Sequence, residues 1–115
     1  MNRASLAALA GCVLIPAASA DGLRVACWNV EFYNGGRGAD IRTAVYGTFN
    51  GRSLAPDVFL LQEFDGQTAA NTFAAELNAA PQSGGDWVAA IVYDNGNDNN
   101  AVVYRTSRLT LIGSV

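Results

Sequence analysis

Residues 56–63 read Pro56-Asp57-Val58-Phe59-Leu60-Leu61-Gln62-Glu63, and the apolar run inside this stretch decides the fold. Four consecutive apolar residues, bounded by a proline and by polar side chains, are typical of a short strand that is covered on both faces. The stretch therefore predicts a buried strand that ends in a carboxylate at Glu63.

The segments on either side of this strand predict an α/β arrangement. Leu23–Val30 is rich in strand formers and predicts a strand with both faces largely covered, in which Cys27 is a buried structural thiol. Asn50-Gly51 and Pro56 end a predicted helix that starts at Ala39, whose apolar stripe is Ile41, Ala44, Val45, Thr48 and Phe49.

A second apolar stripe predicts a helix between a plausible N-cap at Asp65 and a stop at Pro81, formed by Ala70, Phe73, Ala74 and Leu77. The pattern then changes to strands, at Trp87–Tyr93, Ala101–Tyr104 and Leu109–Val115, with residues 94–100 as a hairpin loop. This order predicts a mixed sheet with helices on one face. The other face is then apolar, and either self-association or a further part of a larger domain must cover it.

The first 20 residues predict a secretory signal peptide. One positive charge precedes a short apolar run, and Ala18-Ser19-Ala20 offers small residues for cleavage before Asp21. The alternative is a lipoprotein acylated at Cys12, because Leu9-Ala10-Gly11-Cys12 resembles a lipobox. Either way the product is secreted or periplasmic, without a membrane span, and residues 21–115 have the length of one small domain.

The charge balance is acidic once the leader is removed. Arg3 leaves with the leader, so six arginines face ten acidic residues and the net charge is −4. The chain has no Lys and no His. This balance argues against binding nucleic acid through a basic face, but a nuclease is compatible with it because divalent metal ions supply positive charge.

Two polar residues follow buried stretches and are the candidate site residues. Asn29 and Glu63 each end a predicted strand, where sheets present functional groups, and an enclosed carboxylate is stabilised by a divalent cation. The alternative is that Glu63 simply leaves its strand for solvent. Ordinary loop or turn positions are expected for Glu31, Asn34, Arg37 and Asp98, and packing roles for Phe32, Tyr33 and Tyr46.

The combination of Ala26-Cys27-Trp28-Asn29-Val30 with Gln62-Glu63 after a buried strand resembles the endonuclease/exonuclease/phosphatase family, which includes the DNase I-like nucleases. Asn100-Ala101-Val102-Val103-Tyr104-Arg105 is similar to a later strand of that family, so the resemblance spans Leu23–Val115. It implies a four-layer α/β/β/α sandwich. It also implies a metal-dependent phosphodiesterase in which Glu63 ligates Mg²⁺ or Mn²⁺ and Asn29 helps to hold the metal or the scissile phosphate.

The chain departs from the family in lacking the histidines that activate water and stabilise the transition state. The expectation is therefore an N-terminal portion of the domain, with the second sheet missing, that is inactive alone. The parent protein is then a secreted phosphodiesterase, with nucleic acid as the expected substrate and sphingomyelin or inositol phosphates as alternatives. A non-catalytic secreted module or a truncated gene remnant is the alternative from another class.

Overall fold

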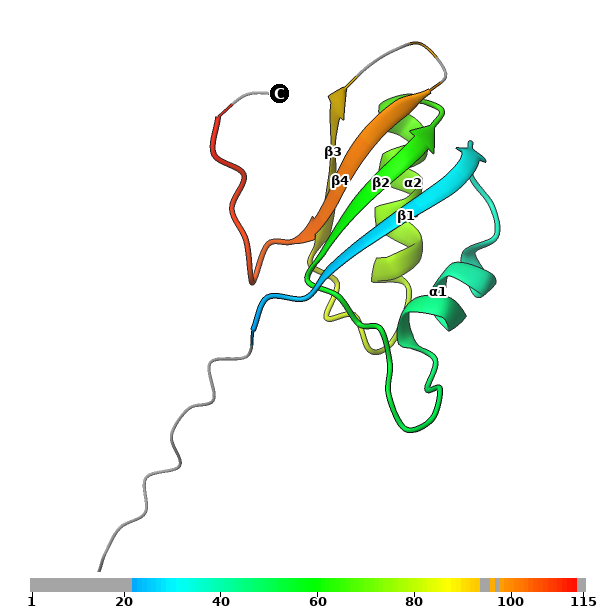
Figure 1. The fold of residues 1–115 in the computed structure, drawn as a ribbon, viewed down its shortest axis with the longest axis vertical. Coiled ribbons are helices and arrows are strands. Elements are labelled where there is room, and N and C mark those ends of the chain that lie inside the picture. Colours follow the sequence, from blue (N-terminus) through cyan, green and yellow to red (C-terminus); the bar gives the residue numbers. More distant parts are fainter. Residues whose placement is uncertain (1–21, 94–95, 97, 114–115) are drawn as a thin grey trace, which may run out of the picture.

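The computed structural model describes residues 22–93, 96 and 98–113. The predicted leader, its cleavage site and Cys12 lie outside the described residues. Six elements follow one another, namely β1 (Val25–Tyr33), α1 (Gly38–Tyr46), β2 (Val58–Phe64), α2 (Gly66–Asn78), β3 (Trp87–Tyr93) and β4 (Asn99–Arg105). The strand order in the sheet is β1-β2-β4-β3 (Figure 1).

The sheet is mixed, and both helices pack on the same face of it (Figure 1). β1 pairs parallel to β2, while β4 pairs antiparallel to both β2 and β3. The α/β class, the mixed sheet and the β3-β4 hairpin are thus confirmed. Among the described residues, no helix combines the length and the apolar character needed to cross a bilayer.

The core lies between the sheet and α2, and Phe73 is its centre. This fully buried ring makes edge-on contacts at centroid distances between 5.6 and 6.1 Å with the rings of Trp28, Tyr33, Phe59 and Phe64. Edge-to-face pairs of this kind add stability beyond the burial of their area. Strands β1 and β2 are therefore fixed to α2 through one aromatic cluster.

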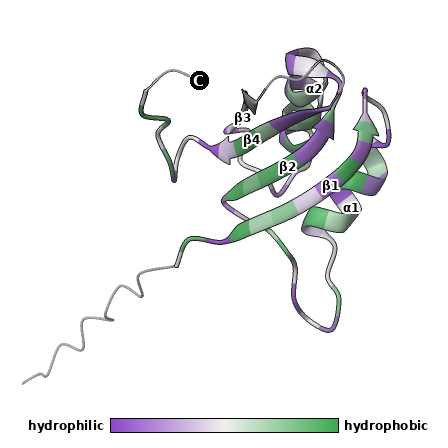
Figure 2. Ribbon diagram, turned by 45° about the horizontal axis from the view of Figure 1, so that its top comes forward, coloured by the Kyte–Doolittle hydropathy of each residue, from purple (hydrophilic) through white to green (hydrophobic). Residues whose placement is uncertain are grey.

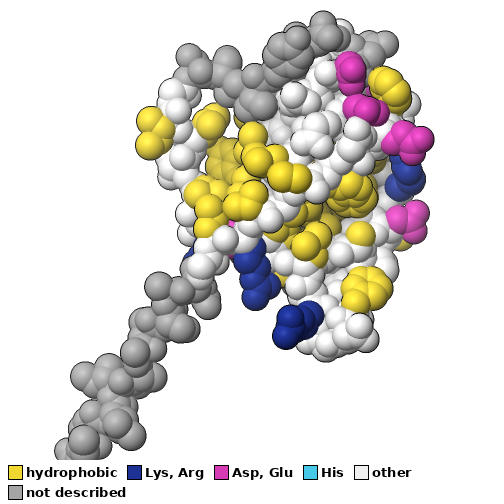
Figure 3. Space-filling model, viewed as in Figure 1, with side chains coloured by type: hydrophobic (Ala, Val, Ile, Leu, Met, Phe, Trp, Pro, Cys, Tyr) yellow, Lys and Arg dark blue, Asp and Glu magenta, His cyan; other side chains and the backbone are white. Residues whose placement is uncertain are grey.

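The face of the sheet opposite the helices is apolar and open (Figure 3). Val25 is 54% exposed and Leu60 is 40% exposed, so the prediction that β1 and β2 are covered on both faces is wrong. Cys27 is also exposed, contrary to the predicted buried thiol. The physical reason is that both helices lie on the other face, so the outward-facing side chains of Val25, Cys27 and Leu60 meet no covering helix. This surface is called the outer face below.

Helix α1 ends at Tyr46, earlier than predicted. Gly47 has extended backbone, and Phe49 and Arg52 form a small antiparallel bridge. Asn50 and Gly51 lie between them with φ of 51° and 74°, the signature of a two-residue turn with both residues left-handed. That turn takes Thr48 and Phe49 out of the helical stripe, and Phe49 is 61% exposed.

The predicted strand at Leu109–Val115 is absent from the described part of that segment, residues 109–113. The chain reverses after β4, because the backbone N–H groups of Arg108 and Leu109 both donate to the Arg105 carbonyl. Leu109 and Leu111 then line a shallow groove with Val58 and side chains of β4. This contact buries Val58 without strand pairing.

Helix α2 fits its prediction closely. Its apolar stripe is buried and it ends at Asn78, before Pro81. Asp65 occupies the N-cap position, but its side chain makes no capping hydrogen bond.

Candidate functional site

The candidate site lies where β1 and β2 end side by side. The two strands run parallel, with Asn29 opposite Gln62 in the register, so Glu63 follows one position further along the same edge. Figure 2 shows the hydrophobic colour of β2 giving way to hydrophilic colour at this end of the strand. The sheet thus brings together the two residues that the sequence singled out, which are 34 positions apart.

A bulge in β2 decides where the Glu63 side chain points. Phe59 and Leu61 are buried toward the helices, and strict alternation would place Glu63 inside and Phe64 outside. Instead Glu63 has a left-handed backbone with φ of 63°, and Phe64 is fully buried. The ladder to β4 shifts register between Leu61 and Phe64. The bulge therefore turns the carboxylate out of the core.

A second irregularity at the end of β1 faces the first. Glu31 and Phe32 have φ of 53° and 52°, while Val30 and Tyr33 on either side are buried. Phe32 is 59% exposed, so its predicted packing role is wrong, whereas Tyr33 is buried as expected. Non-glycine residues in left-handed backbone are uncommon and cost free energy, and they gather at functional sites in proteins. Three of them gather here, beside Asn29.

Two hydrogen bonds fix the Asn29 amide. Its Oδ1 accepts from the backbone N–H of Glu31 at 2.9 Å, and its Nδ2 donates to Oε1 of Glu63 at 2.7 Å. Because a backbone N–H only donates, it faces the amide oxygen, so the nitrogen must face Glu63. Asn29 thereby connects the bulge of β1 to the carboxylate on β2.

The donor set at this edge provides one well-placed carboxylate for a metal ion. No group of three His, Cys, Asp or Glu residues gathers anywhere in the described part of the chain. Mg²⁺ often keeps several waters and is held by one or two carboxylates together with substrate phosphates. Glu63 fits that mode of binding, since Asn29 engages only Oε1 and Oε2 remains available on a partly exposed side chain.

The charge distribution favours a cation at this end. Figure 3 shows acidic side chains, interspersed with basic ones, beside the ends of β1 and β2, and further basic side chains toward the opposite end of the sheet. There Arg24, Arg105 and Arg108 line one pocket with Asp57. Asp65 and Asp98 are exposed, in keeping with the solvated turn expected for Asp98. Clustered carboxylates of one sign raise the local concentration of cations.

Asp57 is a polar residue whose role the sequence analysis missed. It is 7% exposed, accepts the backbone N–H of Arg24 at 2.9 Å and pairs with Arg108 at 3.2 Å. A carboxylate directly before a buried strand indicates a residue that joins chain segments through polar contacts, because a carboxylate cannot be enclosed without hydrogen-bonding or charged partners. Its role is structural, at the end of the sheet opposite Glu63.

Comparison of the chain with protein-family models, with curated proteins and with solved structures finds no match.

Proposed function

We propose that this chain carries part of the active site of a secreted, divalent-metal-dependent phosphodiesterase, with nucleic acid as the substrate. The observation that carries the proposal is the hydrogen bond between Asn29 and Glu63 at adjacent strand ends. In this proposal the mixed sheet is one of the two sheets of a DNase I-like sandwich, and the outer face is where the second sheet packs.

Glu63 is the proposed ligand for Mg²⁺ or Mn²⁺. A hard cation prefers carboxylate oxygen, and when bound there it neutralises charge on a phosphate oxygen during attack at phosphorus. Asn29 holds the carboxylate through Nδ2, so we assign it a positioning role. A direct contact of Asn29 with the metal or the phosphate remains a prediction, because Oδ1 is engaged by the N–H of Glu31.

Manganese binding tests the proposal. Free Mn²⁺ is measured by electron paramagnetic resonance during titration of the wild type, Glu63→Gln and Asp65→Asn. Asp65 is the matched control because it is an exposed carboxylate two residues away. We expect weak binding to the wild type and to Asp65→Asn, and a loss of more than about tenfold in affinity for Glu63→Gln. Equal binding by all three proteins would contradict the assignment of Glu63.

Activity of the chain on its own is a separate question. The sequence contains no His, and one carboxylate does not supply both a metal site and a general base. We therefore expect no plasmid nicking by the 115-residue chain with Mg²⁺. Nicking that EDTA and Glu63→Ala both abolish would show that the residues present suffice for catalysis.

The second candidate function is a non-catalytic secreted module. It is favoured by the same two observations, the lack of His and the lack of three gathered ligands among the described residues. The manganese titration separates the two candidates, because binding of Mn²⁺ through Glu63 is expected for the phosphodiesterase and not for a non-catalytic module.

A further inference from the structure

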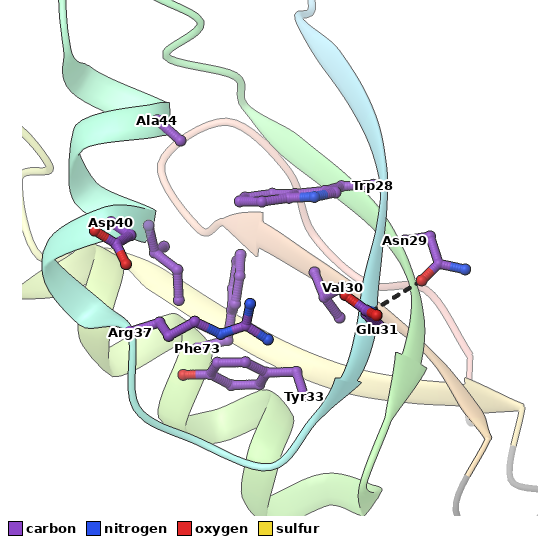
Figure 4. Close-up of a pocket in the computed structure, with 10 residues that line it drawn as sticks. Trp28, Asn29, Val30, Glu31, Tyr33, Arg37, Asp40, Ala44 and Phe73 are labelled. Carbon is purple, nitrogen blue, oxygen red and sulfur yellow. Dashed lines mark hydrogen bonds between the residues drawn. The ribbon is translucent and has the colours of Figure 1, made fainter.

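A pocket of about 260 Å³ lies between β1 and α1, next to the bulge of β1. Asn29 and Glu31 border this pocket, but the Asn29 side chain points away from it, to the other side of β1 (Figure 4). The pocket wall is mainly apolar and aromatic, formed by Trp28, Val30, Tyr33, Ile41, Ala44 and Phe73. Pockets for drug-sized ligands have volumes of roughly 300 to 1,000 Å³, so this one suits a single ring.

The rim of the pocket carries charges of both signs. Arg37, Asp40 and Glu31 line it, and all three side chains are exposed. Within the described residues Arg37 forms no ion pair. In Figure 4 its side chain extends from the start of α1 across the pocket, close to the ring of Tyr33, with Trp28 at the far side.

We propose that this pocket binds one uncharged planar ring with a hydrogen-bonding edge, of the nucleobase class. The apolar wall receives the ring, while Arg37 donates to its carbonyl or ring-nitrogen acceptors and the rim carboxylates accept from its N–H groups. The inference rests on the proposed function in one respect only, since a nucleobase is the planar ring that a nucleic-acid substrate carries.

The rim charges disfavour the other two substrate classes. Glu31 and Asp40 repel a polyanion such as an inositol phosphate. Arg37 repels the quaternary ammonium of a choline headgroup, although an aromatic wall alone would attract one. An uncharged ring with donors and acceptors is the ligand that satisfies all three rim residues.

The test follows the two indole N–H signals of the ¹⁵N-labelled chain, without metal, as nucleosides are added. Trp28 lines the pocket, whereas Trp87 is buried elsewhere and donates to the Tyr46 hydroxyl, so Trp87 is the internal reference. Adenosine and cytidine are expected to shift the Trp28 signal alone. Phosphocholine and inositol hexakisphosphate are expected to leave it unchanged.

Three variants sharpen this test. Arg37→Ala is expected to weaken nucleoside binding about tenfold, the cost of one lost polar contact to a ligand. Arg52→Ala is the matched control, because Arg52 is exposed and lies outside this pocket. Ala44→Leu fills the pocket from α1 and is expected to abolish binding, while an unchanged Trp87 signal shows that the fold is intact.

The outcomes separate this inference from the proposed function. Nucleoside binding without Mn²⁺ binding at Glu63 supports the pocket and contradicts the phosphodiesterase. Mn²⁺ binding at Glu63 without a nucleoside shift overturns the pocket and leaves the metal site standing. A Trp28 shift with phosphocholine instead of nucleosides, or binding that survives Ala44→Leu, also overturns the inference.

Discussion

The Asn29 amide donates a hydrogen bond to the Glu63 carboxylate across the ends of two parallel strands, with Nδ2 and Oε1 2.7 Å apart. This contact depends on the left-handed backbone at Glu63, because regular alternation would turn the carboxylate into the aromatic core. The candidate metal ligand thus has an unfavourable backbone conformation, and strained backbone of this kind is common at functional sites.

The backbone conformation at Glu63 can be isolated by comparing Glu63→Gly with Glu63→Ala. Both variants lose the carboxylate, but only glycine adopts a positive φ without strain. The strain relieved is about 1–2 kcal/mol, and the extra entropy of glycine in the unfolded chain offsets part of it. We expect Glu63→Gly to be more stable than Glu63→Ala by about 0.5–1 kcal/mol in urea denaturation.

Gln62 provides the control for this comparison. It keeps its pairing with Asn29 of β1 and has no positive φ, so Gln62→Gly should be less stable than Gln62→Ala. The same order of stability at both positions would mean that Glu63 is not left-handed in solution.

Asn29→Asp tests the distance between the two strand ends. An aspartate still accepts the N–H of Glu31, but it cannot donate to Glu63, and two carboxylates then face each other. We expect a loss of about 1 kcal/mol without metal, from repulsion between like charges. Two carboxylates bind Mn²⁺ more tightly than one does. Mn²⁺ should therefore raise the thermal midpoint of this variant more than that of the wild type.

The double variant Asn29→Asp/Glu63→Gln removes the repulsion and is the control. It should recover stability without metal and lose the response to Mn²⁺. An Asn29→Asp variant that is as stable as the wild type, and no more responsive to Mn²⁺, would place the two side chains further apart than the structure does.

Local pattern was sufficient to predict most of the elements. β3 covers the predicted residues Trp87–Tyr93, and α2 buries the predicted stripe around Phe73. The approach of Asn29 to Glu63 was also predictable, because parallel strands present their carboxyl ends at one edge. These features depend on residues close in sequence or on a general property of parallel sheets.

The bulges were not predictable in the same way. Glu31, Phe32 and Glu63 give no sequence signal for left-handed backbone, since none of them is Gly, Asn or Asp. One local hydrogen bond accompanies the bulge of β1, from the N–H of Glu31 to the Asn29 side chain, and one tertiary hydrogen bond follows the bulge of β2, from the N–H of Asp65 to the Tyr33 carbonyl. The tertiary partner appears only after the strands are paired.

The helix boundary at α1 is a different case. The sequence predicts a helix that reaches Phe49 and ends at Asn50-Gly51, but this dipeptide forms a tight turn between Phe49 and Arg52. Asn-Gly can end a helix or form a tight turn, and the bridge here needs only one residue on either side of it, Phe49 and Arg52. The signal was present, and the interpretation of it was wrong.

The acid sensitivity of the fold should depend on Asp86, directly before β3. Its carboxylate accepts hydrogen bonds from Arg105 Nε at 3.0 Å and from the backbone N–H and hydroxyl of Ser107. Burial alone raises the pKa of this carboxyl, but the bonds from Ser107 and Arg105 outweigh it and hold the pKa below its ordinary value of 3.8.

Because the pKa of Asp86 is lower in the folded than in the unfolded chain, the unfolded chain takes up the proton first. The stabilisation is therefore complete above the unfolded-state pKa and is lost as the pH falls through the folded-state pKa. Asp86→Asn should cost about 1–3 kcal/mol near pH 7, and this difference should shrink at about pH 2.5. Urea denaturation at both pH values measures it, with the exposed Asp40→Asn as the control.

The outer face predicts self-association of the 115-residue chain, and Leu60 is the position at which to test it. Leu60 is 40% exposed in the middle of the sheet, and its register partners on either side are Cys27 and Val102. Contiguous apolar surface of this kind is typical of interfaces. Burying a leucine contributes about 1.5–3 kcal/mol, so Leu60→Lys should raise the dissociation constant of the self-associated chain by at least about tenfold in sedimentation equilibrium.

Ile112→Lys is the matched control, because Ile112 is 93% exposed and lies outside the strands. A wild type that stays monomeric at all concentrations, or an Ile112→Lys variant that dissociates as readily as Leu60→Lys, would contradict the assignment of the outer face as the interface.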